Sequence, residues 1–320
     1  MIKWEKMCWL WIWNKKRRRE WRDEYRKCTH YYGRYIYGGQ VGSDIISKVL
    51  NTGRPCMVMR FAGQEFYTSS CLFDQRDKKR VVFPEKTKRD ICNLSGFFPN
   101  NDSFLTRFSS ELLNNILPQA DVIALWKPKG ERDIIQTYNK TATLVDFDAL
   151  GPNVESPSWT ACLAGRKVLV IHPFAKTIES QYKKRKVLFR DSRILPDFEL
   201  KTLRAIQGLG GLDNGRFSNW FEALNFMCRQ IDQIDFDIAL IGAGAYGMFL
   251  AQYVKQIGKQ SVHTAGATQL LFGIKGHRWL HEQPEFAQRI FNEHWVFPLP
   301  EETPVTLDAI MRAEDCRCYW

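Results

Sequence analysis

Residues 236–279 read FDIALIGAGAYGMFLAQYVKQIGKQSVHTAGATQLLFGIKGHRW, and this stretch decides the fold. Its apolar run Ile238–Ile241 predicts a buried strand, the glycines that follow predict a tight turn, and the residues up to Gln256 predict a helix. A second strand is expected at Ser261–Thr264. A strand, a glycine turn, a helix and a strand are together typical of one unit of a parallel α/β sheet. The first N–H groups of a helix are unpaired and lie at its positive dipole end, so this turn suits a bound phosphate.

The rest of the chain repeats this alternation of buried strands and helices. The segments expected as further strands are 56–59, 121–126, 142–147 and 167–172. Such repetition predicts a Rossmann-like, doubly wound α/β fold, in which a mostly parallel sheet carries helices on both faces. We expect this folded domain to cover residues 41–320 and residues 1–40 to form a basic, Trp-rich arm and a linker.

The positive charge of the chain is concentrated at its N-terminus. The net charge is +11, and residues 1–30 carry ten Lys and Arg against four Asp and Glu, so +6 of the charge lies there. This distribution predicts a basic arm on a mildly basic domain rather than a nucleic-acid-binding protein. The nine cysteines are scattered, no secretory signal precedes them, and Cys316-x-Cys318 lacks the second pair of a zinc site. We therefore expect reduced thiols in the cytoplasm.

The arm itself combines tryptophan with positive charge. Five of the eleven tryptophans lie in the first 21 residues, beside the cationic run Lys15–Arg19. The apolar run Met7–Trp13 is far shorter than the roughly 20 residues of a spanning helix. Tryptophan rings and cations both suit the headgroup layer, so we expect residues 1–30 to bind peripherally to the inner face of a membrane. An arm that docks on the core and a tail that binds nucleic acid stay open as alternatives. Residues 31–39 are expected to be the linker.

The glycines 242, 244 and 247 match the dinucleotide pattern G-x-G-x-x-G. That pattern also requires an acidic residue about 20 positions later, at the end of the next strand, where it holds the ribose hydroxyls. His263 occupies this position, with Thr264 after it. An NAD(P) cofactor therefore loses most of its support. A different phosphate-bearing ligand and a turn that only permits tight strand–helix packing remain as interpretations.

Several motifs together resemble the glycosyltransferases of the GT-D fold and their GT-D-like relatives, which are often found in bacterial cell-surface polysaccharide loci. They are LIGAGAYGMFLAQYVKQIGKQSVH with ATQLLFGIKGHRW after it, Arg60-Phe-Ala-Gly-Gln-Glu65-Phe, Gly96-Phe-Phe-Pro99, Val170-Ile-His172-Pro-Phe, Leu195-Pro-Asp-Phe-Glu-Leu-Lys201-Thr and the final Cys-Tyr-Trp. The resemblance covers residues 40–320. It implies a nucleotide-sugar donor and a glycan or lipid-linked acceptor in cell-surface polysaccharide synthesis.

The resemblance departs from the family pattern at its metal motif. The family's D-x-E motif, which holds a divalent metal on the donor diphosphate, falls on Gly63-Gln64-Glu65. Glu65 matches the second acid, while Gly63 stands where the first should be. One carboxylate is a poor cage for Mn²⁺ or Mg²⁺, so no metal site is assigned, and Glu65 is the ligand if a metal binds.

We assign roles to the motif residues on this basis. Departure of a diphosphate requires positive charge or N–H groups, and an acceptor hydroxyl requires a base, for which Glu65 and His263 are the candidates. The candidates for binding the donor phosphates are Arg60, Gly242, Gly244, Tyr246, Gly247, Lys275 and Arg278. The candidates for contacts with the sugar or the nucleobase are Gly266, Thr268 and Gln269.

Each assignment has a structural alternative. Glu65 could cap its helix or pair with Arg60, and Lys275 and Arg278 could form a solvated basic face. His172, at a strand end before a proline, is more often a structural histidine than a catalyst. At the level of function, the alternatives are a non-catalytic nucleotide- or glycan-binding protein of the same fold and an NAD(P)-dependent oxidoreductase.

Overall fold

The computed structural model describes residues 29–151, 158–208 and 216–302. Most of the arm, residues 1–28, lies outside the described residues, and so does the final Cys-Tyr-Trp. Within the described ranges, no helix is both long enough and apolar enough to cross a membrane.

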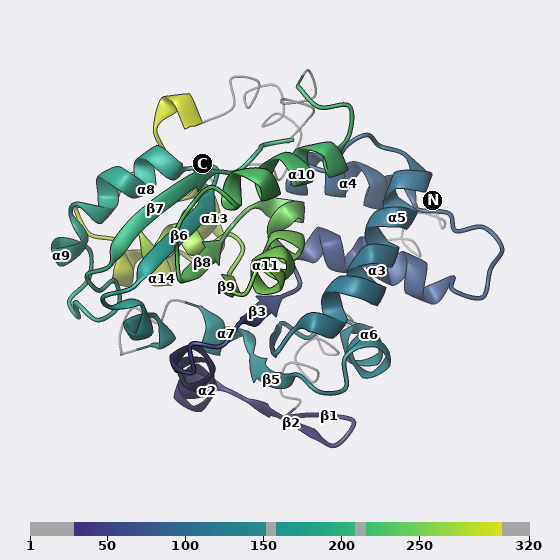
Figure 1. The fold of residues 1–320 in the computed structure, drawn as a ribbon, viewed down its shortest axis with the longest axis horizontal. Helices are drawn as coiled ribbons and strands as arrows, with labels where there is room; N and C mark the ends of the chain where they lie inside the picture. The colour runs from purple at the N-terminus through teal and green to yellow at the C-terminus, as the bar shows by residue number, and fades with distance from the viewer. Residues whose placement is uncertain (1–28, 152–157, 209–215, 303–320) are drawn as a thin grey trace, which may run out of the picture.

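A nine-stranded sheet runs through the middle of the molecule (Figure 1). Its order is β1-β2-β5-β4-β3-β9-β8-β6-β7, and only the β1–β2 pair is antiparallel. The strands are β1 (His30–Tyr31), β2 (Arg34–Tyr37), β3 (Cys56–Arg60), β4 (Val122–Leu125), β5 (Thr143–Asp146), β6 (Lys167–His172), β7 (Glu199–Arg204), β8 (Ile238–Ile241) and β9 (Gln260–His263). The predicted Rossmann-like α/β class, with a mostly parallel sheet, is confirmed.

Helices cover both faces of this sheet because successive strand residues point to opposite sides. In β3, Met57 and Met59 belong to one apolar core, whereas Cys56 and Val58 belong to the other. The first core is covered by α3 (Gly63–Asp74), α4 (Glu85–Ser95), α5 (Asp102–Glu111), α6 (Glu131–Tyr138), α10 (Trp220–Ile231) and α11 (Gly247–Gln256). The second is covered by α2 (Gly39–Asn51), α7 (Phe147–Leu150), α8 (Ala175–Tyr182), α9 (Arg185–Leu188), α12 (Ala267–Leu271), α13 (His277–Glu282) and α14 (Pro284–Ile290).

The segment expected as a linker, residues 31–39, is part of the sheet instead. It holds most of the β1–β2 hairpin, and β2 pairs in parallel with β5. Tyr31 and Ile36 are buried, and Gly33 makes the turn with a φ of +80°. The residues after Gly33 include Tyr35, Ile36 and Tyr37, types that favour strands, and the sheet begins at His30, before the boundary expected near Val41.

The strand order reverses direction between β3 and β9. From β3 the chain builds outward to β4 and β5 through helices on one face, whereas β6 leads outward to β7 through α8 and α9 on the other face. In open α/β sheets, a ligand crevice lies at this kind of reversal, beyond the carboxyl ends of the strands. Figure 1 shows α3, α4 and α5 on one side of this point and α8 and α9 on the other.

Candidate functional site

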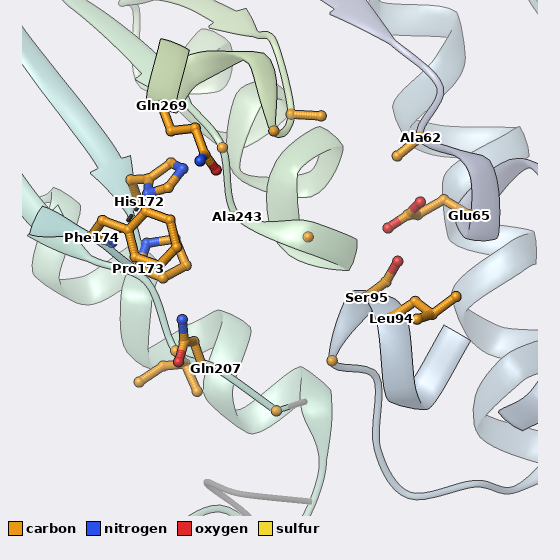
Figure 2. A pocket seen from close by; sticks show the side chains of 17 residues that line it. Ala62, Glu65, Leu94, Ser95, His172, Pro173, Phe174, Gln207, Ala243 and Gln269 are labelled. Atoms are coloured by element: carbon orange, nitrogen blue, oxygen red, sulfur yellow. Dashed lines mark hydrogen bonds between the residues drawn. The ribbon is translucent and has the colours of Figure 1, made fainter. Parts of the chain in front are cut away.

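A pocket lies where the topology places it, beyond the carboxyl ends of β3, β9, β8, β6 and β7 (Figure 2). The end of α4 closes it from the side. Its lining residues are Ala62, Glu65, Leu94, Ser95, Gly96, His172, Pro173, Phe174, Ile206, Gln207, Gly208, Gly242, Ala243, Gly244, Ala265, Gly266 and Gln269. The predicted site residues Glu65, Gly242, Gly244, Gly266 and Gln269 are thus brought together, although they come from distant parts of the chain.

Glu65 provides the carboxylate of this pocket. It is the third residue of α3 and is buried, and among the described residues neither of its side-chain oxygens has a hydrogen-bond partner at normal geometry. Burial raises the pKa of Glu65, and the nearby Ser95 hydroxyl and Arg60 guanidinium oppose this rise. Figure 2 shows its carboxylate directed into the pocket beside Ser95. Burial of a carboxylate without a hydrogen-bond partner costs free energy. Such a group is typical of a site that binds a ligand or transfers a proton.

The glycine turn forms the pocket wall that faces Glu65, and a side chain at Gly242 or Gly244 would collide with neighbouring atoms. A Cβ on Gly244 would lie 2.7 Å from the Ser95 carbonyl oxygen, and Gly244 has a φ of +52°. A Cβ on Gly242 would lie 2.6 Å from the Ala265 carbonyl oxygen. The turn is therefore packed tightly between α4 and the loop after β9. The N–H groups of Gly244 and Ala245 precede its first internal bond, from Tyr246 N to Ala243 O at 3.1 Å, and so are not used within it.

The loop after β9 is strained at the pocket wall. Ala265 has a φ of +51°, a left-handed conformation that costs a non-glycine residue about 1 kcal/mol. Its carbonyl oxygen accepts from the Thr268 hydroxyl at 2.8 Å, and Thr268 is itself buried and does not line the pocket. Gln269 does line the pocket, and its amide nitrogen donates to the Lys275 carbonyl oxygen at 3.1 Å. Strain of this kind clusters at functional sites.

Three predicted site residues lie beneath the pocket wall instead of lining it. His263 is buried, and its Nδ1 lies 3.2 Å from the Ile241 carbonyl oxygen. A Cβ on Gly247 would lie 2.0 Å from the His263 ring, so Gly247 gives the ring its space under α11. Burial lowers the pKa of His263 to about 3, with help from the charge of Arg60. Tyr246 is also buried and stacks on Trp220, with ring centroids 4.8 Å apart.

The three predicted cations do not line the pocket either. Arg60 ends β3, but its guanidinium lies over the Phe147 ring, 4.4 Å from the centroid. Lys275 lies at a separate hollow beside α13 and α14. Arg278 is exposed and forms an ion pair of 3.2 Å with Glu282. Glu65 and His172 are the only ionisable side chains among the lining residues, and none of those residues is Lys or Arg.

A metal finds few protein ligands here. In the described part of the chain, no group of three His, Cys, Asp or Glu side chains could hold an ion. Glu65 is the single carboxylate among the described lining residues, and Gly63, two positions before it, has no side chain. These residues do not by themselves fit Mn²⁺ or Mg²⁺, which require several oxygen ligands.

His172, Gln207 and Ser95 line the pocket but were not among the predicted site residues. For His172 the signal was available, since it ends a buried strand on the same sheet edge as the glycine turn. Nothing local predicted Ser95, which reaches the pocket only because α4 packs against the glycine turn.

No family model and no curated protein matches the chain. Among solved structures, the chain is similar to a selenomethionine-substituted domain of unknown function 1792 (DUF1792). The TM-score is 0.37 and the sequence identity 10%, over 81% of this chain and 96% of that chain. A likeness at this level says nothing about activity. The α/β fold class is shown by the parallel sheet and its helices.

Proposed function

We propose that this chain is a glycosyltransferase, which transfers a sugar from a nucleotide-sugar donor to a glycan or lipid-linked acceptor in cell-surface polysaccharide synthesis. The observation that carries the proposal is the buried Glu65 carboxylate, which faces a glycine turn across a pocket at the reversal point of a parallel sheet. The sequence motifs that resemble GT-D-like glycosyltransferases supply the reaction class. Membership of that family is part of the proposal.

In this proposal Glu65 accepts the proton of the acceptor hydroxyl. A general base works best when its pKa lies near the operating pH, and burial raises the pKa of Glu65 in that direction. His263 was the other candidate. It is neutral at physiological pH but buried away from the pocket lining, so Glu65 is the better placed of the two.

The diphosphate would bind at the glycine turn. The described lining offers it no Lys or Arg side chain, so we assign to it the N–H of Gly244, which lines the pocket and is not used within the turn. Arg60 would act on the bound ligand at a distance, since its positive charge reaches Glu65, where it opposes the rise in pKa that burial causes. We derive no step through a metal ion, because the protein side chains here do not fit one.

A second candidate is a non-catalytic nucleotide- or glycan-binding protein of the same fold. It is favoured by the single carboxylate and by Gly63 in place of the family's first acid. For the NAD(P)-dependent alternative, the position of the ribose-binding acid is held by His263, which is buried under α11. No described contact therefore favours the nicotinamide cofactor.

Binding and turnover separate these candidates. Thermal shifts with UDP-, GDP- and CMP-sugars and with NAD(P), each with and without Mn²⁺, identify the ligand class. Release of the nucleotide in the presence of lipid or glycan acceptors then tests transfer. Stabilisation by NAD(P) alone would refute the proposal, and sugar-nucleotide binding without turnover would favour the second candidate.

The variant Glu65→Gln tests the assigned base directly. We expect transfer to fall by about 10² to 10⁴, the usual contribution of a general base, with donor binding retained. Glu131→Gln is the matched control, because Glu131 is also buried with a raised pKa but does not line the pocket. Equal rates in the wild type and in Glu65→Gln would remove Glu65 from the mechanism.

The basic arm remains a proposal about location. Tryptophans and cations in residues 1–28 would hold the enzyme on the inner face of a membrane, near a lipid-linked acceptor. Deletion of these residues keeps β1 whole, since that strand begins at His30. Loss of binding to anionic vesicles is expected, and unchanged binding would refute the anchor.

A further inference from the structure

The wall of the pocket opposite Glu65 includes the imidazole of His172, which can donate a hydrogen bond. This side chain ends β6 and is only 3% exposed, yet it lines the pocket. Its Nδ1 accepts a hydrogen bond of 3.1 Å from the Phe174 N–H, so the proton of the neutral ring is on Nε2. Among the described residues, Nε2 has no hydrogen-bond partner. Figure 2 shows His172 and Glu65 on opposite sides of the pocket.

The ring of His172 is fixed before any ligand arrives. The Phe174 N–H holds one nitrogen, and the Phe174 ring lies against the imidazole, with centroids 4.8 Å apart. Gly242 closes the other side, because a Cβ there would lie 2.7 Å from His172 Cδ2. A donor held in this way loses little conformational entropy when it binds an acceptor.

This donor is neutral. Burial lowers the pKa of His172 to about 3, so the ring carries no charge at physiological pH. It therefore cannot neutralise a diphosphate, whereas it can donate one hydrogen bond to an uncharged oxygen or nitrogen.

The surroundings of His172 suit the same kind of ligand group. The carboxamides of Gln207 and Gln269 lie on this side of the pocket in Figure 2, and Pro173 and Ile206 add apolar surface. The described lining on this side has no Lys or Arg, so a phosphate here would meet only neutral side chains, whereas the glycine turn can offer it backbone N–H groups. A flat, uncharged group with polar edges matches this composition.

We propose that this wall is the nucleobase subsite and that His172 Nε2–H donates to a carbonyl oxygen of the base. The phosphates of the same ligand then extend toward the glycine turn. This inference rests on the proposed function, since it names the part of the nucleotide sugar that each end of the pocket binds. His172 is thus a specificity-determining residue, and it takes no proton during the transfer.

Two substitutions separate the donor from the local structure. In His172→Asn, the short amide oxygen can still accept from the Phe174 N–H, but the donor no longer reaches the pocket. In His172→Gln, the amide nitrogen can reach the position of Nε2, while the bond to Phe174 is lost. Titration calorimetry of the full chain compares both variants with the wild type, using UDP, GDP and CDP, with inorganic pyrophosphate as the probe that has no base.

We expect His172→Asn to weaken binding of the preferred nucleoside diphosphate by about 3- to 10-fold, the usual contribution of one neutral hydrogen bond. His172→Gln should stay closer to the wild type, and pyrophosphate binding should be the same in all three proteins. Equal losses for the nucleotide and for pyrophosphate would show a merely structural role and overturn the inference. If the wild type binds a nucleotide and His172→Asn binds it equally tightly, the inference is also overturned, but the proposed function stands. Absence of wild-type binding to all three nucleotides would overturn both.

Discussion

Glu131 offers a stability prediction whose size follows from its environment. This carboxylate is fully buried at the start of α6, where one oxygen accepts from the Lys127 N–H at 2.9 Å and from the Tyr31 hydroxyl at 3.2 Å. Its other oxygen has no partner in the described residues. Burial raises the pKa of Glu131 from 4.5 to about 8, so the folded protein keeps this group protonated at neutral pH.

The sign of the pH effect follows from that shift. A raised pKa means that the folded state holds the proton more tightly than the unfolded state. The stability linked to this proton is fully present below pH 4.5 and is lost as the pH rises toward 8. Each pH unit in this window costs about 1.4 kcal/mol, which amounts to roughly 3 kcal/mol at pH 7.

The substitution Glu131→Gln removes this loss. A glutamine oxygen can accept the same two hydrogen bonds, and its NH₂ group takes the place of the protonated oxygen. We expect equal unfolding free energies near pH 4, and a variant more stable than the wild type by roughly 3 kcal/mol at pH 7. Urea unfolding at several pH values measures the difference. Glu85→Gln is the control, because the Glu85 side chain is 83% exposed. Parallel curves of stability against pH for the wild type and Glu131→Gln would show that Glu131 does not have a raised pKa in the folded protein.

Two further substitutions test the packing and the metal motif. Gly247→Ala puts a Cβ 2.0 Å from the His263 ring and should destabilise the protein by about 3 kcal/mol or more. In thermal unfolding, the double variant that also carries His263→Ala should recover much of this loss. Stability losses of the two substitutions that simply add in the double variant would contradict the contact. Gly63→Asp has room, since the nearest atom to a Cβ there is 3.9 Å away, and it adds a second acid near Glu65. In calorimetry with a nucleoside diphosphate present, we expect Gly63→Asp to bind Mn²⁺ at least about tenfold more tightly than the wild type. The control Gly63→Asn should not show this gain. Equal Mn²⁺ affinities of Gly63→Asp and the wild type would contradict the prediction.

The fold class could be predicted from the sequence because the buried strands are short apolar runs between helices. Ile238–Ile241 and Lys167–His172 have the predicted bounds. The sheet order could not be predicted, since the contact of β3 with β9 joins residues about 200 positions apart and no local pattern encodes it. The β1–β2 hairpin was missed because its glycines and tyrosines resemble a linker.

The candidate site was predictable in part for the same reason. Glu65 and the glycine turn were expected at the carboxyl ends of strands, and strand ends of one parallel sheet share an edge. Lys275 and Arg278 were assigned by their proximity in sequence to the turn, yet the chain leads them away to α13 and its neighbourhood. Their proposed role in phosphate binding stays a prediction without a described contact to the pocket.

The proposed sugar-nucleotide site is the pocket beyond the carboxyl ends of β3, β9, β8, β6 and β7, and hydrogen exchange of the backbone amides can locate the bound ligand. A saturating nucleotide sugar, chosen by the thermal-shift screen, is added to the full chain, and peptide masses report the change. We expect slower exchange at residues 62–65, 94–96, 242–245 and 265–269, with the hollow beside α13 and α14 unchanged. Protection confined to that second hollow, or no protection by any nucleotide sugar, would contradict it.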